Sequence, residues 1–320
     1  MADNEVRVGL VGCGMHSREV LLPAVQRAGM ELAAICDLDK RLAQRVTRRF
    51  GAFRAYQDIG RMVEEMDLDA VAACGPPEMH AEAAEIALRG GCHIWTEMPA
   101  APTSDEAKRL GELATERELI AQTGLVMRFA PAYERLRAIC ADEEFGEVRS
   151  IEVAWWPPKM HAHEEPLLFD LPHALDMVRF IGGDVARLCV VRASGDDALQ
   201  IAMRLQSGAV AMVSFAAPAD CSRERVSVSS ARATASVEGR QIVTLRRCGR
   251  DETSVWGGRL QTVGEGAGPE QTQGFVPQME QFAAAVAGEE TPRATINDAE
   301  YVLRLSELVV AGTGELVDLP

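Results

Sequence analysis

The stretch that decides the fold lies near the start of the chain, where residues 6–25 read VRVGLVGCGMHSREVLLPAV. An apolar run ends in a turn of the form G-x-G-x-x-S, and a helical pattern follows it. Gly12 permits a tight strand-to-helix turn, Gly14 lets the backbone approach a pyrophosphate, and Ser17 is small enough for close packing. The helix that starts here presents free N–H groups to an anion. We therefore predict a dinucleotide site, although glycine-rich turns also close ordinary connections between strands and helices.

The second apolar stretch of the chain ends in Asp37, about 25 residues after Gly12. This is close to where a ribose-binding acid is expected. A carboxylate there repels a 2′-phosphate, so NAD is favoured over NADP, although Lys40 and Arg41 partly offset that repulsion. The alternative is that Asp37 only caps the next helix. Because Asp39 is equally able to cap it, Asp37 remains available for the ribose.

Composition and charge narrow the class of protein. A chain of 320 residues with 47% hydrophobic content predicts two domains with ample material for burial. The first residues, MADNE, have neither the basic nor the apolar region of a signal peptide, and no membrane segment is apparent, so we expect a cytoplasmic protein. Eight cysteines are scattered without a CxxC pair, which predicts reduced and mostly buried thiols. A formal net charge of −15 argues against nucleic acid as a partner.

Strands and helices alternate along the first part of the chain. Strand-like runs begin at residues 69, 92 and 119, and helical patterns cover 81–89 and 105–118. This order predicts a parallel sheet, which binds ligands beyond the carboxyl ends of its strands. Seven residues fall at those ends: Gly12, Gly14, Asp37, Pro76, Pro77, Glu97 and Met98.

After about residue 146 the pattern changes to runs of alternating residues. These runs cover 148–156, 186–193, 199–205, 210–216, 226–230, 234–237 and 241–246. They predict an α+β domain with a largely antiparallel, open sheet, and the open face is a natural surface for self-association. Residues 257–274 are rich in Gly, Gln and Glu and predict a loop. Helices are expected at 276–287 and 297–311.

Several short motifs occur in one order along the chain. They are the glycine turn, Cys36-Asp37, Gly75-Pro76-Pro77 with His80, Glu97 with Pro99, Met127-Arg128-Phe129 with Pro131, Phe145-Gly146-Glu147-Val148, and a helix start at His173 with Asp176. In these motifs the chain resembles the glucose-fructose oxidoreductase, inositol dehydrogenase and rhizopine-catabolism family (Gfo/Idh/MocA) over nearly all of its length. The resemblance implies a Rossmann domain at residues 1–122 and an α/β domain for substrate binding and oligomerisation at 123–320. It also implies NAD(P)-dependent oxidation or reduction of sugars, polyols and related small molecules.

The resemblance, together with the glycine turn, also marks the residues expected to bind the cofactor. These are Gly12, Gly14, Met15, His16, Asp37, Gly75, Pro76, His80, Glu97, Met98 and Arg128. Two of them have a second interpretation: His16 either reaches the pyrophosphate or is solvated, and His80 lies near the nicotinamide or is structural.

The family signature E-K-P is replaced here by Glu97-Met98-Pro99. In typical members that lysine resembles an electrostatic anchor for the reacting oxygen, whereas methionine carries no charge and donates no hydrogen bond. Losing such a donor costs about a hundredfold or more in the rate of alcohol chemistry. Lys40 and Lys108 are expected on helix surfaces. We hypothesise that Lys159, which follows the first strand of the second domain, supplies the charge instead.

A second departure concerns the catalytic histidine. Family members place an aspartate four residues before it, whereas Asp170 precedes His173 by three. His173 fits a general acid or base that moves a proton as hydride moves to or from nicotinamide C4. The alternative is a helix-start histidine satisfied by backbone. Asp170 either orients the imidazole or caps the helix, and Asp176 either lines the cleft and contacts substrate or braces Arg179.

The segment between the two domains' motifs is expected to form a substrate lid that includes His163. With His161, Glu164, Glu165, Asp170 and His173 it has the residue types of a metal site, but nothing fixes a third ligand, so we predict no metal. Trp155 and Trp156 would form an apolar or sugar-stacking wall. At least one of the two should pack inside, because neighbouring side chains of a strand face opposite ways. We assign Trp156 to the substrate.

The sequence therefore predicts an NAD(H)-dependent oxidoreductase for a small polar substrate such as a sugar, polyol, ketone or imine. Two alternatives stay open. The first is a nucleotide-binding regulator or scaffold without turnover, and the second is a non-redox enzyme in which bound NAD is recycled. As partners we expect a small-molecule substrate and a second copy of the chain, as a homodimer or homotetramer through the second sheet, with neither nucleic acid nor membrane.

Overall fold

The computed structural model describes residues 5–156, 166–194, 198–216, 223–249, 253–257, 273–312 and 316–319. The chain divides into two compact units. Unit 1 comprises Met1–Val126 and Gly274–Leu303, and unit 2 comprises Met127–Gln273 and Arg304–Pro320. The first crossing lies close to the predicted boundary after residue 122. The prediction of one continuous second domain misses the return of residues 274–303 to unit 1.

Unit 1 is built on a six-stranded sheet in the order β3-β2-β1-β4-β5-β6. Its strands are β1 (Arg7–Val11), β2 (Glu31–Cys36), β3 (Arg54–Tyr56), β4 (Ala70–Ala73), β5 (His93–Thr96) and β6 (Ala121–Thr123). All neighbouring pairs are parallel, as the alternation of strands and helices predicts. The central strand β4 is buried along its whole length, which fits the continuous apolar runs of a sheet covered on both faces. Strand β3 was not among the predicted strands.

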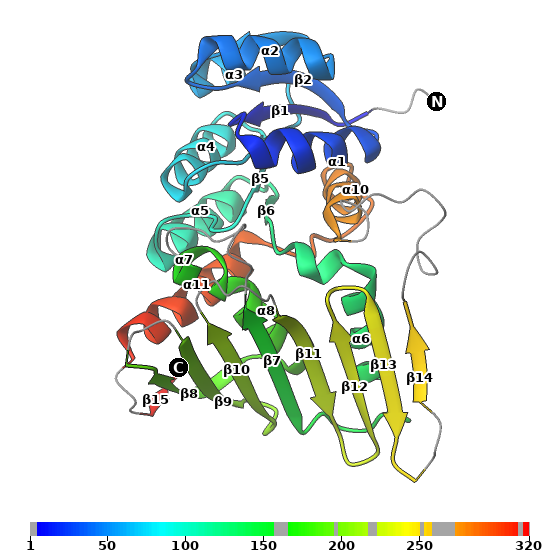
Figure 1. Cartoon of the computed structure of the whole chain (residues 1–320). Helices are drawn as coiled ribbons and strands as arrows, with labels where there is room; N and C mark the ends of the chain where they lie inside the picture. The colour runs from blue at the N-terminus through cyan, green and yellow to red at the C-terminus, as the bar shows by residue number, and fades with distance from the viewer. Residues whose placement is uncertain are drawn as a thin grey trace. The chain divides into compact units, whose positions relative to one another are not determined.

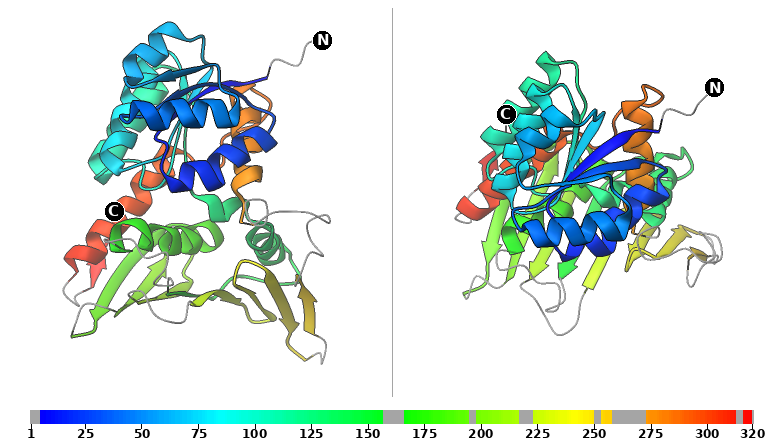
Figure 2. Two further views of the ribbon diagram at one scale, coloured as in Figure 1. Left: turned by 45° about the horizontal axis from the view of Figure 1, so that its top comes forward. Right: turned by 90° about the horizontal axis from the view of Figure 1, so that it is seen from above.

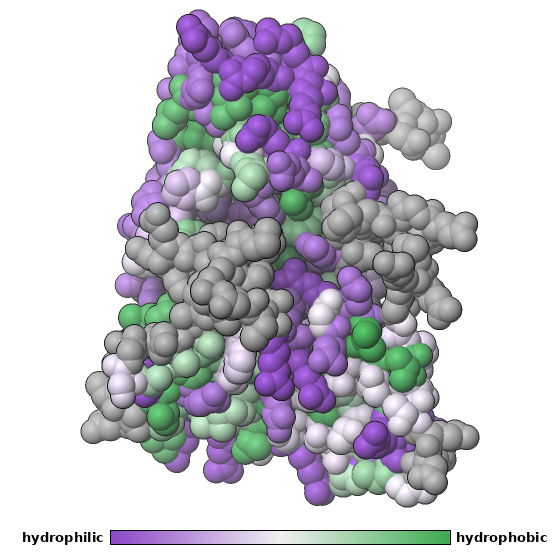
Figure 3. Space-filling model, in the orientation of Figure 1, coloured by the Kyte–Doolittle hydropathy of each residue, from purple (hydrophilic) through white to green (hydrophobic). Residues whose placement is uncertain are grey.

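Helices cover this sheet (Figure 1). They are η1 (Ser17–Leu21, a π-helical turn), α1 (Leu22–Arg27), α2 (Lys40–Phe50), α3 (Ile59–Glu65), α4 (Pro77–Arg89), α5 (Ser104–Glu116) and α10 (Phe275–Val286). As expected, Asp39 caps α2 and accepts hydrogen bonds from the backbone N–H groups of Arg41 and Leu42. Figure 3 shows hydrophilic residues gathered over α2 and α3, which agrees with the exposed arginines of α2.

The returning segment completes the β6 edge of unit 1. The backbone N–H of Thr123 donates to the carbonyl of Ala294 over 2.8 Å. The Gln278 side-chain amide of α10 donates to the carbonyl of Thr123 over 2.7 Å. The last helix, α11 (Ile296–Ala311), begins in unit 1 and ends in unit 2. A segment far away in the chain therefore holds the last parallel strand in place.

Unit 2 contains a nine-stranded sheet in the order β14-β13-β12-β11-β7-β10-β9-β8-β15. Its strands are β7 (Ser150–Trp156), β8 (Val185–Arg192), β9 (Ala198–Leu205), β10 (Val210–Ala216), β11 (Arg223–Ser229), β12 (Ala233–Glu238), β13 (Ile242–Arg247), β14 (Thr253–Trp256) and β15 (Val317–Asp318). Every pair is antiparallel except β7 with β10. The seven longer strands are the predicted ones, whereas β14 and β15 were missed.

The helices α6 (Pro131–Ala141) and α8 (Leu171–Gly182) lie on one face of this sheet (Figure 2). A single helical turn, α7 (Pro166–Phe169), precedes α8, and the 3₁₀ turn η2 (Val126–Phe129) precedes α6. Burial alternates along the strands, so that residues of β9 are buried and exposed in turn. This period of two leaves one face of the sheet open, as predicted.

Candidate functional site

The glycine turn after β1 has the geometry that the sequence predicts. Gly12 has a φ of +89°, and a Cβ atom there would lie 2.2 Å from the carbonyl oxygen of Cys74. Only glycine fits such a position without strain. Around Gly14 the opposite holds, because a Cβ atom would meet nothing within 4 Å. Ser17 is fully buried and Met15 is 67% exposed. The turn thus combines a tightly packed entry with an open cradle above Gly14.

Asp37 connects the end of β2 to this turn. Its Oδ2 accepts a hydrogen bond of 2.7 Å from the backbone N–H of Cys13, and its Oδ1 accepts one of 2.8 Å from the backbone N–H of Asp39. Each carboxylate oxygen has a second lone pair for a hydroxyl group. Since Asp39 caps α2, Asp37 is not the cap of that helix. The predicted ribose acid is therefore held by backbone beside the glycine turn.

His16 and Glu97 form an ion pair above the same turn. The Nε2 atom of His16 lies 3.0 Å from Oε1 of Glu97, and Glu97 Oε2 accepts a hydrogen bond of 2.8 Å from the backbone N–H of Met98. Burial lowers the pKa of His16, but the hydrogen bond and charge of Glu97 outweigh it and raise that pKa above its usual value. The imidazole also contacts the ring of Phe275 edge-on at 5.4 Å. His16 thus forms an ion pair and an aromatic contact.

His80 is fully buried, and both of its ring nitrogens are occupied. Nε2 accepts from the backbone N–H of Gly75 over 2.8 Å, and Nδ1 lies 2.7 Å from the carbonyl oxygen of Pro99, to which it donates as Nδ1–H. Burial lowers the pKa of His80, so the ring stays neutral. This geometry favours the structural interpretation: His80 ties together the loops that carry Gly75 and Met98.

Met98 lies in the loop that follows β5, next to Glu97. It is 7% exposed, and its sulfur lies 3.2 Å from the hydroxyl of Thr123, which donates to it. Thr123 is itself fully buried. Methionine therefore contributes packing and a weak acceptor at this position.

In unit 2, His173 lies in the first turn of α8 and stacks on Trp155 of β7. Their ring centroids are 6.1 Å apart and the rings are inclined by 23°. Asp170 stands at the N-cap position of α8 but its side chain makes no capping hydrogen bond. Of the two roles open for Asp170, capping is therefore wrong. Burial raises the pKa of Asp170 to about 6, against the lowering effect of the Arg240 charge.

Trp156 lies on the opposite face of β7 from Trp155. Its indole nitrogen donates to the hydroxyl of Ser214 over 3.3 Å, and the Arg223 guanidinium lies 5.5 Å from its ring centroid. The alternation of side chains along a strand separates the two tryptophans. Our assignment of Trp156 to the substrate is corrected accordingly: Trp155 is the tryptophan beside His173.

Arg128 and Asp176 form a buried ion pair. Nη2 of Arg128 lies 2.5 Å from Oδ1 of Asp176, and only 8% and 2% of the two side chains are exposed. Arg179 pairs with Asp184 over 2.7 Å. The Arg128–Asp176 pair links η2 to α8. As a pair, Arg128 and Asp176 hold the start of unit 2 together.

Arg240 was missed by the sequence analysis. Its guanidinium lies 5.5 Å from the ring centroid of Trp155, and its Nε donates to both carboxylate oxygens of Glu224 at 2.9 and 2.7 Å. The one signal in the sequence is the turn Gly239-Arg240 between two predicted strands. A single arginine in a hairpin carries no recognisable motif, which is why only the folded sheet brings it to Trp155.

Two of the predicted residues, Lys159 and His163, lie outside the described residues, as do His161, Glu164 and Glu165. Within the described part of the chain, no group of three or more His, Cys, Asp and Glu side chains is placed to hold a metal ion. No described helix is long and apolar enough to cross a bilayer. Most described cysteines are buried free thiols, as predicted.

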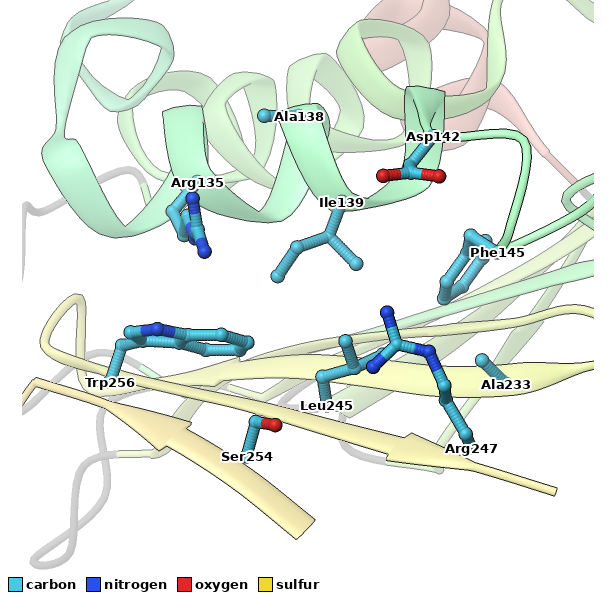
Figure 4. A pocket seen from close by; sticks show the side chains of 10 residues that line it. All are labelled: Arg135, Ala138, Ile139, Asp142, Phe145, Ala233, Leu245, Arg247, Ser254 and Trp256. Atoms are coloured by element: carbon cyan, nitrogen blue, oxygen red, sulfur yellow. The ribbon is translucent and has the colours of Figure 1, made fainter. Parts of the chain in front are cut away.

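A cavity of about 290 Å³ lies elsewhere in unit 2, between α6 and the strands β12 to β14 (Figure 4). Arg135 of α6 points toward Trp256 of β14, with the guanidinium 4.6 Å from the ring centroid. None of the predicted site residues lines this cavity.

Comparison with known proteins fits this geometry. Residues 6–125 match the family described as "Oxidoreductase family, NAD-binding Rossmann fold". This part of the chain therefore matches the NAD-binding domain of the Gfo/Idh/MocA family. It is similar to 1,5-anhydro-D-fructose reductase of Ensifer adhaerens, with 23% identity over 98% of each chain. It is 31% identical to dTDP-3,4-didehydro-2,6-dideoxy-alpha-D-glucose 3-reductase of Actinomadura kijaniata over 49% of this chain, a match that spans only 47% of that relative. The fold resembles levoglucosan dehydrogenase in complex with NADH and L-sorbose, with a TM-score of 0.87, 19% identity and 99% of each chain covered.

The match over residues 6–125 identifies unit 1 as an NAD-binding Rossmann domain. The residues present fit that cofactor, because the open cradle above Gly14 leaves room for a pyrophosphate and Asp37 keeps lone pairs for ribose hydroxyls.

Proposed function

We propose that this protein is an NAD(H)-dependent oxidoreductase that transfers a hydride between nicotinamide C4 and the hydroxyl- or carbonyl-bearing carbon of a small polar substrate, in the first place a sugar or polyol. His173 and Asp170 would handle the proton. Two observations carry the proposal: unit 1 has an open glycine cradle, and unit 2 has an imidazole and a buried carboxylate at the start of α8.

The nucleotide-binding part rests on residues held by backbone. Gly14, Met15 and Asp37 would receive the pyrophosphate and the adenosine ribose, and the carboxylate of Asp37 disfavours a 2′-phosphate. The His16–Glu97 pair would border the pyrophosphate, and Glu97 raises the pKa of His16. The nicotinamide supplies or accepts the hydride when the cofactor is bound.

Proton transfer is assigned to unit 2. Imidazoles titrate near neutral pH, which suits His173 as the group that takes the hydroxyl proton or returns it. Asp170, with a pKa raised to about 6, is poised in the same range. It would orient or recharge the imidazole, since it does not cap the helix. Trp155 stacks on His173 and fixes the plane of its ring.

Met98 limits which chemistry the site performs well. Without an ammonium at this position, a substrate whose electrophile arrives already protonated, such as an iminium, needs less stabilisation of developing negative charge. An imine is therefore the second substrate class, after sugars and polyols. Lys159 remains the proposed alternative source of charge, and Lys159→Ala tests it: unchanged turnover of a confirmed substrate would rule it out.

The first test is calorimetric titration with NADH and NADPH, followed by a substrate screen. Micromolar NADH binding, weaker NADPH binding and stoichiometric change of NADH with a sugar, polyol, ketone or imine are expected. Binding without turnover of any substrate would favour the nucleotide-binding regulator or scaffold. Product formation without net change of NADH would favour the recycled-cofactor alternative, and no binding of either nucleotide would overturn the proposal.

We further propose that the open face of the second sheet joins two copies of the chain. Val210 and Met212 are 53% and 42% exposed on this face, and a depression of about 720 Å³ lies between its strands. Apolar side chains exposed together favour burial in an interface. Light scattering on Met212→Glu should show a shift toward monomer. A monomeric wild-type protein would contradict this proposal.

A further inference from the structure

An unusual turn places Arg240 in the proposed site. Gly239 and Arg240 are the two central residues between β12 and β13, and both have a φ of 57°. The turn is closed by the Gln241 N–H, which donates to the Glu238 carbonyl over 3.2 Å. Hairpin turns of this kind favour glycine or asparagine at both positions. An arginine with a left-handed backbone is unfavourable, and such residues gather at functional sites.

The side chain of Arg240 is held firmly. Its Nε donates to both oxygens of Glu224, and the hydroxyl of Tyr133 donates to Oε1 of the same carboxylate over 2.8 Å. Burial raises the pKa of Tyr133 well above its usual value, so the phenol remains a neutral donor. Three elements, α6, β11 and the β12–β13 turn, thus meet at one guanidinium.

This guanidinium lies over the tryptophan that stacks on the proposed base. It stands 5.5 Å from the ring centroid of Trp155, whose ring stacks on His173. Trp155 is 5% exposed, so Arg240 and His173 pack against a largely buried ring. The Oδ2 atom of Asp170 is buried and has no hydrogen-bond partner in the described part of the chain. A buried carboxylate without such a partner needs a nearby positive charge.

We propose that Arg240 is a positioning residue of the acid/base site: it compensates the charge of the buried Asp170 carboxylate and holds Trp155 against His173. Arg240 is thus a fixed cation in unit 2, whereas Met98 in unit 1 carries no charge. The inference rests on the proposed function of Asp170 and His173. Arg240 is the positive charge that acts on Asp170, lowering its pKa against the effect of burial.

His173, three residues after Asp170 in α8, is the ionisable group that Asp170 is proposed to orient. The other charged groups that the structure places around this helix contact different partners. On the elements packed against this helix they are Tyr133 with Glu224, Arg128 with Asp176, Arg179 with Asp184, and Arg137, which lies over Phe180. The inward residues of β7 and β10 are apolar. Among these described groups, Arg240 is therefore the cation whose removal should raise the pKa of Asp170.

The test is a carbon-13 NMR titration of protein labelled at the aspartate carboxyl carbon, with Asp170→Asn to assign the signal. Arg240→Gln should raise the pKa of Asp170 by about one unit or more, the usual effect of losing a nearby opposite charge. Arg240→Lys keeps the charge and should restore most of the wild-type value. In an active enzyme the acidic limb of kcat/KM should move with the NMR titration.

Arg223→Gln is the matched control. Arg223 also lies 5.5 Å from a tryptophan ring centroid, but over Trp156 on the other face of β7. Both substitutions remove one positive charge, so the two variants have the same net charge. This variant should leave the Asp170 titration as in wild type. An equal shift in Arg223→Gln and Arg240→Gln, or no shift in Arg240→Gln, would overturn the inference.

A second variant covers the case in which Arg240→Gln does not fold. Glu224→Gln removes the carboxylate that offsets Arg240, and should lower the pKa of Asp170; an unchanged or raised pKa would contradict the inference. Because the titration needs neither cofactor nor substrate, a protein without turnover would count against the proposed function while the role of Arg240 is still tested.

Discussion

Thr123 donates a hydrogen bond from its hydroxyl to the sulfur of Met98 across 3.2 Å. Thr123 is fully buried at the end of β6, where its backbone also joins the segment that returns from the far end of the chain. Met98 is therefore integrated into the packing of unit 1.

This contact predicts a coupling between the two side chains. Met98→Leu leaves the buried Thr123 hydroxyl without its acceptor and should cost about 1–3 kcal/mol of unfolding free energy. Met98→Leu combined with Thr123→Val removes both partners and should cost less than the sum of the single variants. Denaturant unfolding of the four proteins provides the measurement, and strictly additive effects would contradict the coupling.

Substitutions at the two glycines of the turn should have different effects, one on stability and the other on NADH binding. Gly12→Ala brings a Cβ atom 2.2 Å from the Cys74 carbonyl at a φ of +89° and should strongly destabilise unit 1. Gly14→Ala meets no neighbour and should leave the midpoint of thermal unfolding nearly unchanged, but fill the cradle and weaken NADH binding at least tenfold, about 1.4 kcal/mol. Calorimetry and thermal unfolding separate the two effects. If Gly14→Ala bound NADH normally, the pyrophosphate would not bind at Gly14.

Asp37 and Asp39 form a matched pair of carboxylates. Asp37→Ala should weaken NADH binding about tenfold or more, because ribose hydroxyls lose a charged acceptor worth about 1.5–3 kcal/mol. Asp39→Ala loses the cap of α2 and should cost about 1 kcal/mol of stability while NADH affinity stays near wild type. If the two variants lost NADH affinity equally, Asp37 would not be the ribose acid.

His80 predicts a dependence of stability on pH. Burial lowers its pKa in the folded protein below that of the unfolded chain, so only the unfolded state gains a proton between the two values. The stability of unit 1 should be fully present above pH ~6.5 and fall as pH drops through the lowered pKa. His80→Asn should flatten this fall. His16→Gln is the control, since the raised pKa of His16 predicts the opposite sign, a contribution lost as pH rises.

The two tryptophans of β7 should differ in their effect on catalysis. Trp155→Phe should lower kcat, because His173 loses part of the ring that fixes its plane. Trp156 lies on the open face of the sheet, so Trp156→Phe should leave kcat near wild type. Steady-state kinetics on a confirmed substrate measure both effects. A larger loss of kcat in Trp156→Phe would show that Trp156, as first predicted, is the tryptophan that contacts the substrate.

Local sequence predicted much of the fold. The parallel sheet, the cap at Asp39 and most strands of the second sheet follow from short-range patterns, because turn chemistry and the periods of burial are local properties. The short strands β14 and β15 and the return of residues 274–303 to unit 1 were missed. Edge strands of two to four residues carry too little pattern, and a segment's distant partner leaves no local mark.

The sequence by itself determined the glycine turn at Gly12 and Gly14 and the placement of Asp37 at the end of β2, because a tight turn and a strand-end carboxylate are properties of neighbouring residues. Only the tertiary structure decided which tryptophan faces His173, that Arg128 is paired with Asp176, and that Arg240 stands over Trp155. These choices depend on the register of strands and on contacts between residues 48 to 85 positions apart. Such long-range pairings are selected by burial and charge in the folded chain.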